Sequence, residues 1–438
     1  MSYGGPPQQP PYGGGYPPPN QGGYGQQYPQ QQGNWGPPPP QQHGNWGAPP
    51  GGPPPQQGGW GPPPGPPQQG GWGPPPGGPP PQQGGWGPPP GAPPQWQQGP
   101  PQQQGGYPPP QQGGYGPPAQ PSPGYDPRAV AQGDASRDAD ALRAAMKGFG
   151  TDEKALIRIL SKPDPLQIAL LRNTYNTRLR RNLEADIKSE TSKYFCDGLV
   201  AIVQGPLGHD VHEVNRSIKG IGTKESVLND VLIGRSNADM RAIKQAYQET
   251  FRKSLESEVK GDLSMKTEQL FGLIMAATRA EESAPIDHNQ IDRDVQDLHR
   301  AMDARIGTDQ ITVCSILSQR SDGQVRAIAH HWKQKYHSDM EKVVDSEFSG
   351  HMKDALLLMV RRATDRAMSD ALQLEEAMAG MGTKDNLLVA RIVRLHWNRQ
   401  HMDQVKRAYQ HRFKKDLIQR VKGEISGDYE NLMVACLT

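Results

Sequence analysis

A short loop ending in Gly-Thr recurs four times along this 438-residue chain. One carboxylate follows each loop: 38 residues lie between the threonine and the acid in the first three cases, and 40 in the fourth. A spacing that recurs so regularly predicts a repeated structural unit in which loop and acid hold equivalent positions. The four pairs are the loop 146–151 with Glu190, the loop 218–223 with Asp262, the loop 302–308 with Glu347, and the loop 378–383 with Glu424.

The last glycines of these loops, at positions 150, 222, 307 and 382, give the length of the repeat. The intervals are 72, 85 and 75 residues, and a polar link accounts for the longer middle interval. This link divides the repeats two and two, as a hinge or groove between two pairs would. We expect four units at 134–206, 207–280, 291–364 and 365–438, with the link at 281–290.

Hydrophobic residues within each unit follow a helical period. In the first unit Leu156 and Leu160 lie four positions apart, and Leu179, Leu183 and Ile187 continue with the same spacing. Such spacing places apolar side chains on one buried stripe of a helix. The breaks between stripes predict five short helices per unit, and no segment alternates with the period of two that a strand requires. The fold class is therefore expected to be all-α.

The first 125 residues form a different kind of polymer from the rest. They contain no Asp, Glu, Lys or Arg, and consist largely of Pro, Gly, Gln, Tyr and Trp. Because they hold too few aliphatic side chains to offset the entropy of ordering, residues 1–125 are predicted to be a disordered tail. Its regularly spaced aromatic rings favour weak self-association or capture of a protein partner. A flexible spacer without a specific ligand is the alternative.

Charge and cysteine content argue against several function classes. The net charge of +2 gives no strong field for nucleic acid, and the tail lacks the arginines that would accompany stacking on RNA bases. The three cysteines, Cys196, Cys314 and Cys436, are too far apart in sequence to indicate a disulfide framework. We see no signal peptide and no run of about 18 apolar residues, so we expect a cytoplasmic protein. No phosphate-binding loop, paired-carboxylate motif or nucleophile elbow indicates an enzyme.

The repeated loop has the chemistry of a calcium site. Glycine accepts a positive φ, so a Gly-x-Gly-Thr turn can point several carbonyls at one ion. In the first unit these are the carbonyls of Met146, Gly148 and Gly150, with the carboxylate of Glu190 as the acidic ligand. Thr151 is placed to cap the helix that follows. One carboxylate makes a weak site, which a phosphate oxygen of an anionic lipid would complete. A single loop of this kind is also a common helix-connecting turn, and a single acid is normally solvated. The fourfold repetition indicates that the four loops and their acids are structurally equivalent.

The chain resembles the annexin family in three stretches: Met-Lys-Gly-Phe-Gly-Thr-Asp-Glu at 146–153, Asp-Ile-Lys-Ser-Glu at 186–190 and Val-Lys-Gly-Asp at 259–262. The resemblance extends over all four repeats, and the long tail is similar to those of fungal annexins and of the long-tailed vertebrate ones. The resemblance to annexins implies a curved disc of four repeats with five helices each. Calcium loops would lie on its convex side, against a membrane, and the tail on its concave side.

The resemblance also implies a set of calcium ligands in every repeat. The third repeat departs from the usual pattern, with one extra loop residue and Ala304 where glycine is usual, and the fourth has Ala379 in place of the loop lysine. The implied metal ligands are Met146, Gly148, Gly150 and Glu190 in repeat 1, Ile218, Gly220, Gly222 and Asp262 in repeat 2, Met302, Arg305, Gly307 and Glu347 in repeat 3, and Met378, Gly380, Gly382 and Glu424 in repeat 4.

A polar pair at the centre of the family's fold is implied for Asp210 and Arg235, which we expect to form a buried structural salt bridge. A further arginine that the family places there falls on Ala390 in this chain, with Arg391 adjacent to it.

Together these features predict a protein that binds anionic phospholipid membranes when calcium rises and releases them when it falls. Calcium would supply the attraction to an anionic surface that a net charge of +2 does not supply. Such a protein would take part in membrane organisation or trafficking, with Ca²⁺ as its ligand. The alternative is a scaffold whose tail drives self-association or binds a partner.

Overall fold

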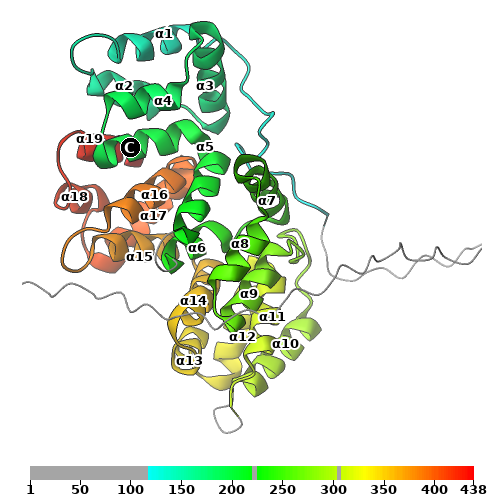
Figure 1. The fold of residues 1–438 in the computed structure, drawn as a ribbon. Coiled ribbons are helices and arrows are strands. Elements are labelled where there is room, and N and C mark those ends of the chain that lie inside the picture. The colour runs from blue at the N-terminus through cyan, green and yellow to red at the C-terminus, as the bar shows by residue number, and fades with distance from the viewer. Residues whose placement is uncertain (1–116, 220–223, 303–306) are drawn as a thin grey trace, which may run out of the picture. The chain divides into compact units, whose positions relative to one another are not determined.

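The computed structural model describes residues 117–219, 224–302 and 307–438. Every regular element in these ranges is a helix, and none is a strand (Figure 1). The prediction of an all-α fold is therefore confirmed. Residues 1–116, which hold most of the segment expected to be a disordered tail, lie outside the described residues.

The helices follow one another in four groups of five, as the sequence predicts. The first group contains α1 (Ser136–Ala145), α2 (Glu153–Leu160), α3 (Pro165–Leu179), α4 (Leu183–Glu190) and the first half of α5 (Lys193–Ile218). The second contains the rest of α5 with α6 (Glu225–Leu232), α7 (Asn237–Phe251), α8 (Leu255–Asp262) and α9 (Met265–Met275). The third contains α10 (His288–Ala301), α11 (Gln310–Gln319), α12 (Asp322–Tyr336), α13 (Met340–Glu347) and α14 (Gly350–Thr364). The fourth contains α15 (Arg366–Met378), α16 (Asp385–His396), α17 (Arg399–Phe413), α18 (Leu417–Lys422) and α19 (Gly427–Leu437).

Local sequence sets where these helices begin and bend. α3 begins with a capping box: Asp164 accepts a hydrogen bond from the backbone N–H of Gln167, and the Gln167 side chain accepts one from the backbone N–H of Asp164. α5 is kinked at Gly205, which has a φ of +71°, and Pro206 starts the next helical segment. The first and second repeats are thus joined by one bent helix.

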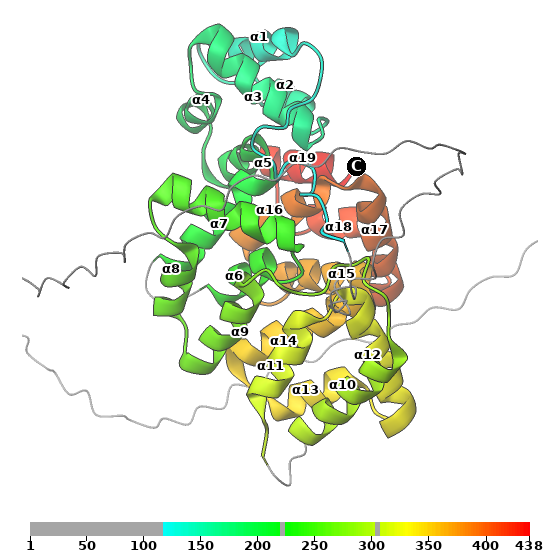
Figure 2. The same cartoon turned by 90° about the vertical axis from the view of Figure 1, so that its right-hand side faces the viewer.

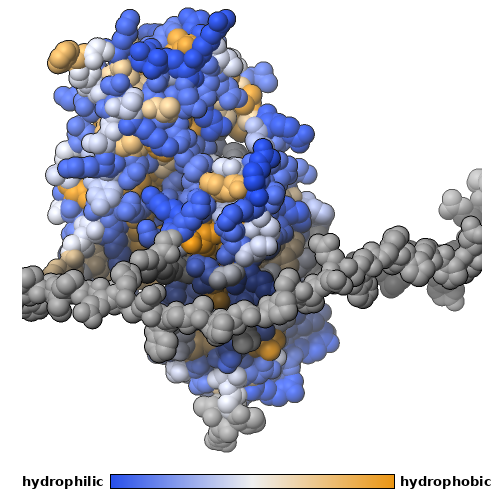
Figure 3. All heavy atoms as spheres, in the orientation of Figure 1, coloured by the Kyte–Doolittle hydropathy of each residue, from blue (hydrophilic) through white to orange (hydrophobic). Residues whose placement is uncertain are grey.

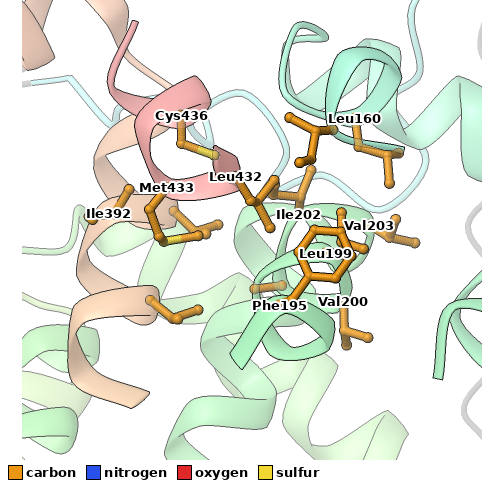
Figure 4. Packing of buried hydrophobic residues seen from close by; sticks show 14 of the residues in the cluster. Leu160, Phe195, Leu199, Val200, Ile202, Val203, Ile392, Leu432, Met433 and Cys436 are labelled. Atoms are coloured by element: carbon orange, nitrogen blue, oxygen red, sulfur yellow. The ribbon is translucent and has the colours of Figure 1, made fainter. Parts of the chain in front are cut away.

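Two hydrophobic cores hold the helices together. One consists mainly of residues from the first and fourth repeats, and the other of residues from the second and third. In the first core Leu199 of α5 and Leu432 of α19 are fully buried, and Figure 4 shows the side chains of these two helices packed closely. Gly198 permits this approach, because a Cβ at that position would lie 2.8 Å from Leu432 Cδ2. The link at 281–290 therefore does not divide the packing, since repeat 1 pairs with repeat 4 and repeat 2 with repeat 3.

Residues 117–125 correct part of the prediction for the tail, because they pack on the helices. Tyr125 is 5% exposed, and its hydroxyl donates a hydrogen bond of 2.6 Å to Asp210 Oδ2. The guanidinium of Arg235 donates to the same hydroxyl at 2.6 Å. Ser122 binds Asp239 through its backbone N–H and its hydroxyl, each at 2.7 Å. Composition alone predicted disorder. The buried ring of Tyr125 and the hydrogen bonds to Asp210 and Asp239 instead order the end of the segment. Figure 2 shows residues 117–125 crossing the helices on the side that faces the viewer.

None of the helices in the described residues is long and apolar enough to cross a membrane. The face shown in Figure 3 is mostly hydrophilic, with hydrophobic residues in isolated spots.

Two buried histidines are expected to make the fold sensitive to acid. His351 of α14 and His396 of α16 are 7% and 3% exposed, and burial lowers the pKa of each imidazole from 6.5 to about 4. Between pH 6.5 and about pH 4 the two histidines bind protons in the unfolded chain but not in the folded one. The free energy of unfolding therefore falls as the pH decreases through this range. Urea unfolding should show a loss of about 2–5 kcal/mol from these two groups together between about pH 7 and about pH 4.5. In the double variant His351→Gln/His396→Gln the decrease should be smaller, and an equally steep decrease would contradict the assignment.

Candidate calcium-binding loops

The first Gly-Thr loop lies between α1 and α2, and its predicted acid, Glu190, is the last residue of α4. The hydroxyl of Thr151 donates a hydrogen bond of 3.0 Å to the backbone carbonyl of Glu190. Gly148 and Gly150 have φ values of +114° and +84°, a conformation that only glycine adopts readily. The structure thus brings the loop and the end of α4 together, as the repeated spacing predicts.

The cap of α2 differs from the prediction. Asp152, not Thr151, caps the helix, because its carboxylate accepts the backbone N–H of Ala155 at 3.0 Å. Thr151 is therefore available to bind Glu190 across the loop.

The third and fourth repeats show the same contact in a more direct form. Thr308 donates a hydrogen bond of 2.9 Å to the carboxylate of Glu347, and Thr383 donates one of 2.9 Å to the carboxylate of Glu424. In both repeats the threonine holds the acid itself against the loop. The loop glycines again have positive φ: +90° at Gly307, +105° at Gly380 and +87° at Gly382.

Part of the predicted ligand set lies outside the described residues. These are Gly220 and Gly222 of the second loop and Arg305 of the third. Of the other ligands there, Ile218 ends α5, Asp262 ends α8 and Met302 directly follows α10. The second site and the middle of the third therefore remain predictions from sequence.

Repeat 4 contains a positive charge between two of its predicted calcium ligands. The guanidinium of Arg420 donates a hydrogen bond of 2.9 Å to the carbonyl of Met378 and forms an ion pair with Glu424. Arg420 also binds Glu375, at 3.3 Å. The hydrogen bond from Arg420 holds the pKa of the Glu424 carboxyl below its usual range. A calcium ion would have to displace this guanidinium from the same oxygens.

Arg420 was missed by the sequence prediction, although its position is a recognisable signal. It lies four residues before the acid, which is one helical turn. The other repeats have Asp186, Glu258 and Val343 at this position, so the arginine distinguishes repeat 4.

Two large apolar side chains at the loop tips were also missed. Phe149 and Met381, each between the two glycines of its loop, are fully exposed. Single exposed apolar side chains are common, but these two hold the same position in two equivalent loops. The signal in the sequence is the apolar residue at the centre of Gly-x-Gly.

The donor set suits a hard cation held largely by backbone oxygen. The described residues contain no group of three or more His, Cys, Asp or Glu side chains that could hold a metal ion. Any ion in these loops must therefore take most of its ligands from carbonyls, which calcium accepts more readily than transition metals do. Glycines that turn the backbone and an acid held beside the loop fit this chemistry.

Four five-helix repeats with a glycine-rich loop and an acid in each define a class of repeat proteins. The annexin family model matches this chain four times, at residues 137–202, 209–273, 293–359 and 369–436. The chain belongs to the annexin family, whose members bind phospholipids in a calcium-dependent manner.

Individual relatives support this assignment. The chain is 40% identical to Annexin C1 of Cryptococcus neoformans over 320 residues, which cover 72% of this chain and 68% of the relative. It is 35% identical to Annexin A13 of Mus musculus over 306 residues, 69% of this chain and 95% of the relative. Among solved structures, chicken annexin V in complex with Zn²⁺ matches with a TM-score of 0.64 and 29% identity, over 70% of this chain and 96% of that one.

Proposed function

We propose that this protein binds anionic phospholipid membranes when calcium fills the Gly-Thr loops, and that each ion is shared between loop carbonyls, one acid and a lipid phosphate. The observation that supports this most directly is the contact between the loop threonine and the acidic residue. It recurs in repeats 1, 3 and 4, at 3.0, 2.9 and 2.9 Å. The acid is therefore beside the carbonyls that it would join in binding an ion.

The ligand count indicates why a lipid would complete the site. Three loop carbonyls and a bidentate carboxylate supply about five oxygens, whereas calcium takes about six to eight. In repeat 1 these are the carbonyls of Met146, Gly148 and Gly150 with Glu190, and in repeat 4 those of Met378, Gly380 and Gly382 with Glu424. A phosphate oxygen would fill one of the remaining positions. Several such sites on one molecule would bind a membrane multivalently.

The exposed loop tips favour a membrane as the partner. Phe149 and Met381 lie at the centres of loops whose carbonyls would hold the ion. An ion bound to a lipid phosphate would bring these side chains to the level of the headgroups, where apolar groups gain from leaving water. A soluble anion would not offer this gain.

The alternative function is self-association or partner binding through the tail, predicted as residues 1–125. Of these, residues 1–116 lie outside the described residues, so this alternative stays a prediction from sequence.

The first prediction concerns the acidic ligand of repeat 1. Glu190→Gln should raise the calcium concentration needed for half-maximal co-sedimentation with anionic vesicles several-fold, because the site loses its one carboxylate. Asp138→Asn, at an exposed acid of α1, is the control and should leave this midpoint unchanged. Equal midpoints for Glu190→Gln and wild type, or co-sedimentation that persists in a chelator, would count against the proposal.

The second prediction concerns the guanidinium in repeat 4. Arg420→Gln should lower the calcium concentration at which the repeat 4 site fills, because the ion no longer competes with a fixed positive charge. The shift is best measured by calorimetric calcium titration in a Glu190→Gln background. Arg412→Gln, at an exposed arginine of α17, is the control. An unchanged or weaker calcium affinity in Arg420→Gln would show that the arginine does not compete.

The third prediction separates membrane contact from calcium binding. The double variant Phe149→Ser/Met381→Ser should bind vesicles more weakly at saturating calcium, by about tenfold, while its calcium affinity without lipid stays the same. Ile286→Ser, at an exposed residue of the link, is the matched control. Vesicle affinity equal to wild type would exclude a role for the loop tips.

A further inference from the structure

Lys193 is the first residue of α5 and lies three residues after Glu190, the acid of the first candidate calcium site. The hydroxyl of Thr151 binds the backbone carbonyl of Glu190 at 3.0 Å, so the turn that leads to Lys193 begins beside the first Gly-Thr loop. Three residues of extended chain span about 11 Å at most, which limits the distance between the Cα atoms of Glu190 and Lys193. Lys193 is exposed. It therefore places an accessible positive charge close to the proposed ion.

The backbone at Lys193 has a conformation that favours glycine. Its φ is +54°, and glycine occupies the equivalent position in repeats 3 and 4, with φ values of +57° at Gly350 and +71° at Gly427. The serine before this position is also equivalent in the three repeats, with φ of −144°, −142° and −145° and ψ of 168°, 163° and 167°. Because a Cβ is strained at a positive φ, repeat 1 has a lysine where glycine would be less costly.

The other described non-glycine residues with a positive φ lie at the C-terminal ends of helices. Arg180, Arg252, His337 and Lys414 cap α3, α7, α12 and α17, and Ala277 follows the cap of α9. A positive φ is common where a helix ends, and the helix dipole favours a basic side chain there. Lys193 instead lies at the N-terminal end of a helix, where the dipole disfavours a positive charge. Neither the backbone nor the dipole therefore explains a lysine at this position.

No group in the described part of the chain neutralises Lys193. It forms no hydrogen bond or ion pair with any residue that the structure describes. The nearest acids in the sequence are Glu190 and Asp197, and neither of them pairs with it. Asp197 lies near Arg216 instead, and the carboxylate of Glu190 is the proposed calcium ligand. The ammonium group of Lys193 is therefore available to a partner from outside the chain.

We propose that Lys193 binds the negative charge of a lipid headgroup beside the calcium ion of repeat 1, and that it strengthens the preference of this site for anionic over zwitterionic lipids. The inference rests on the proposed function, in which a lipid phosphate completes the shell of that ion. Phosphate alone does not distinguish the two kinds of lipid, because phosphatidylcholine also carries one. Its choline group adds a positive charge that Lys193 repels, whereas an anionic headgroup has a net negative charge that the ammonium attracts.

The repeats differ at this position, so their lipid preferences should differ as well. Repeats 3 and 4 have Gly350 and Gly427, and the equivalent residue of repeat 2 is Met265. Repeat 1 is therefore the repeat that has a charged side chain here. Lys147, in the loop 146–151, would act in the same direction. Removal of Lys193 should therefore reduce the preference of repeat 1 for anionic lipid without abolishing it.

The test is co-sedimentation at saturating calcium with vesicles of phosphatidylcholine that contain either phosphatidylserine or phosphatidic acid. Lys193→Gln should weaken binding about fivefold, the factor typical of one lysine at an anionic membrane surface, and Lys193→Arg should bind as wild type does. Lys162→Gln is the matched control, because this exposed lysine follows α2 at the end opposite the Gly-Thr loop. The control removes the same charge and should leave vesicle binding unchanged.

Two further measurements separate a contact with lipid from damage to the calcium site. Without lipid, Lys193→Gln should bind calcium as tightly as wild type or more tightly, because a positive charge near the ion has been removed. Lys193→Gly should weaken vesicle binding as Lys193→Gln does, but it should unfold at an equal or higher urea concentration than wild type. The reason is that glycine relieves the strain of the positive φ.

Equal vesicle binding by wild type and Lys193→Gln would overturn the inference. So would an equal loss in Lys162→Gln, or weaker calcium binding by Lys193→Gln without lipid. A loss confined to vesicles with phosphatidylserine assigns the carboxylate of that headgroup as the partner of Lys193, whereas a loss with phosphatidic acid as well assigns phosphate charge. Failure of wild type to sediment in calcium contradicts the proposed function itself, whereas sedimentation that does not depend on Lys193 contradicts this inference alone.

Discussion

The hydrogen bond from the loop threonine to the acidic residue joins two segments that 38 or 40 residues separate in sequence. It forms only because the fourth helix of the repeat ends beside the loop that follows the first helix. In repeat 1 the threonine binds the main chain of Glu190, whereas in repeats 3 and 4 it binds the carboxylates of Glu347 and Glu424. The candidate site therefore depends on helix packing as much as on the ligands themselves. Loss of that packing would separate the acid from the carbonyls without changing any ligand.

Sequence predicted the features that repeat, and missed those that occur once. The helical period and the loop-to-acid spacing are local and recur four times, so they were sufficient for the fold class and for the placement of Glu190. The packing of Leu199 against Leu432 joins repeats 1 and 4, and no local pattern predicts which repeats will pair. Arg420 was missed because its effect depends on where a long side chain points. The burial of Tyr125 was missed because composition describes the tail as a whole, whereas this one ring at the end of the tail is buried against the helices.

The charged centre of the fold contains one salt bridge that the resemblance implies and one that it does not. The expected salt bridge between Asp210 and Arg235 is present at 2.7 Å. The family's further arginine falls on Ala390, which is buried, and the neighbouring Arg391 binds Asp230 at 2.6 Å instead. A buried carboxylate without a partner would be strongly destabilising, so Arg391 stabilises the buried Asp230.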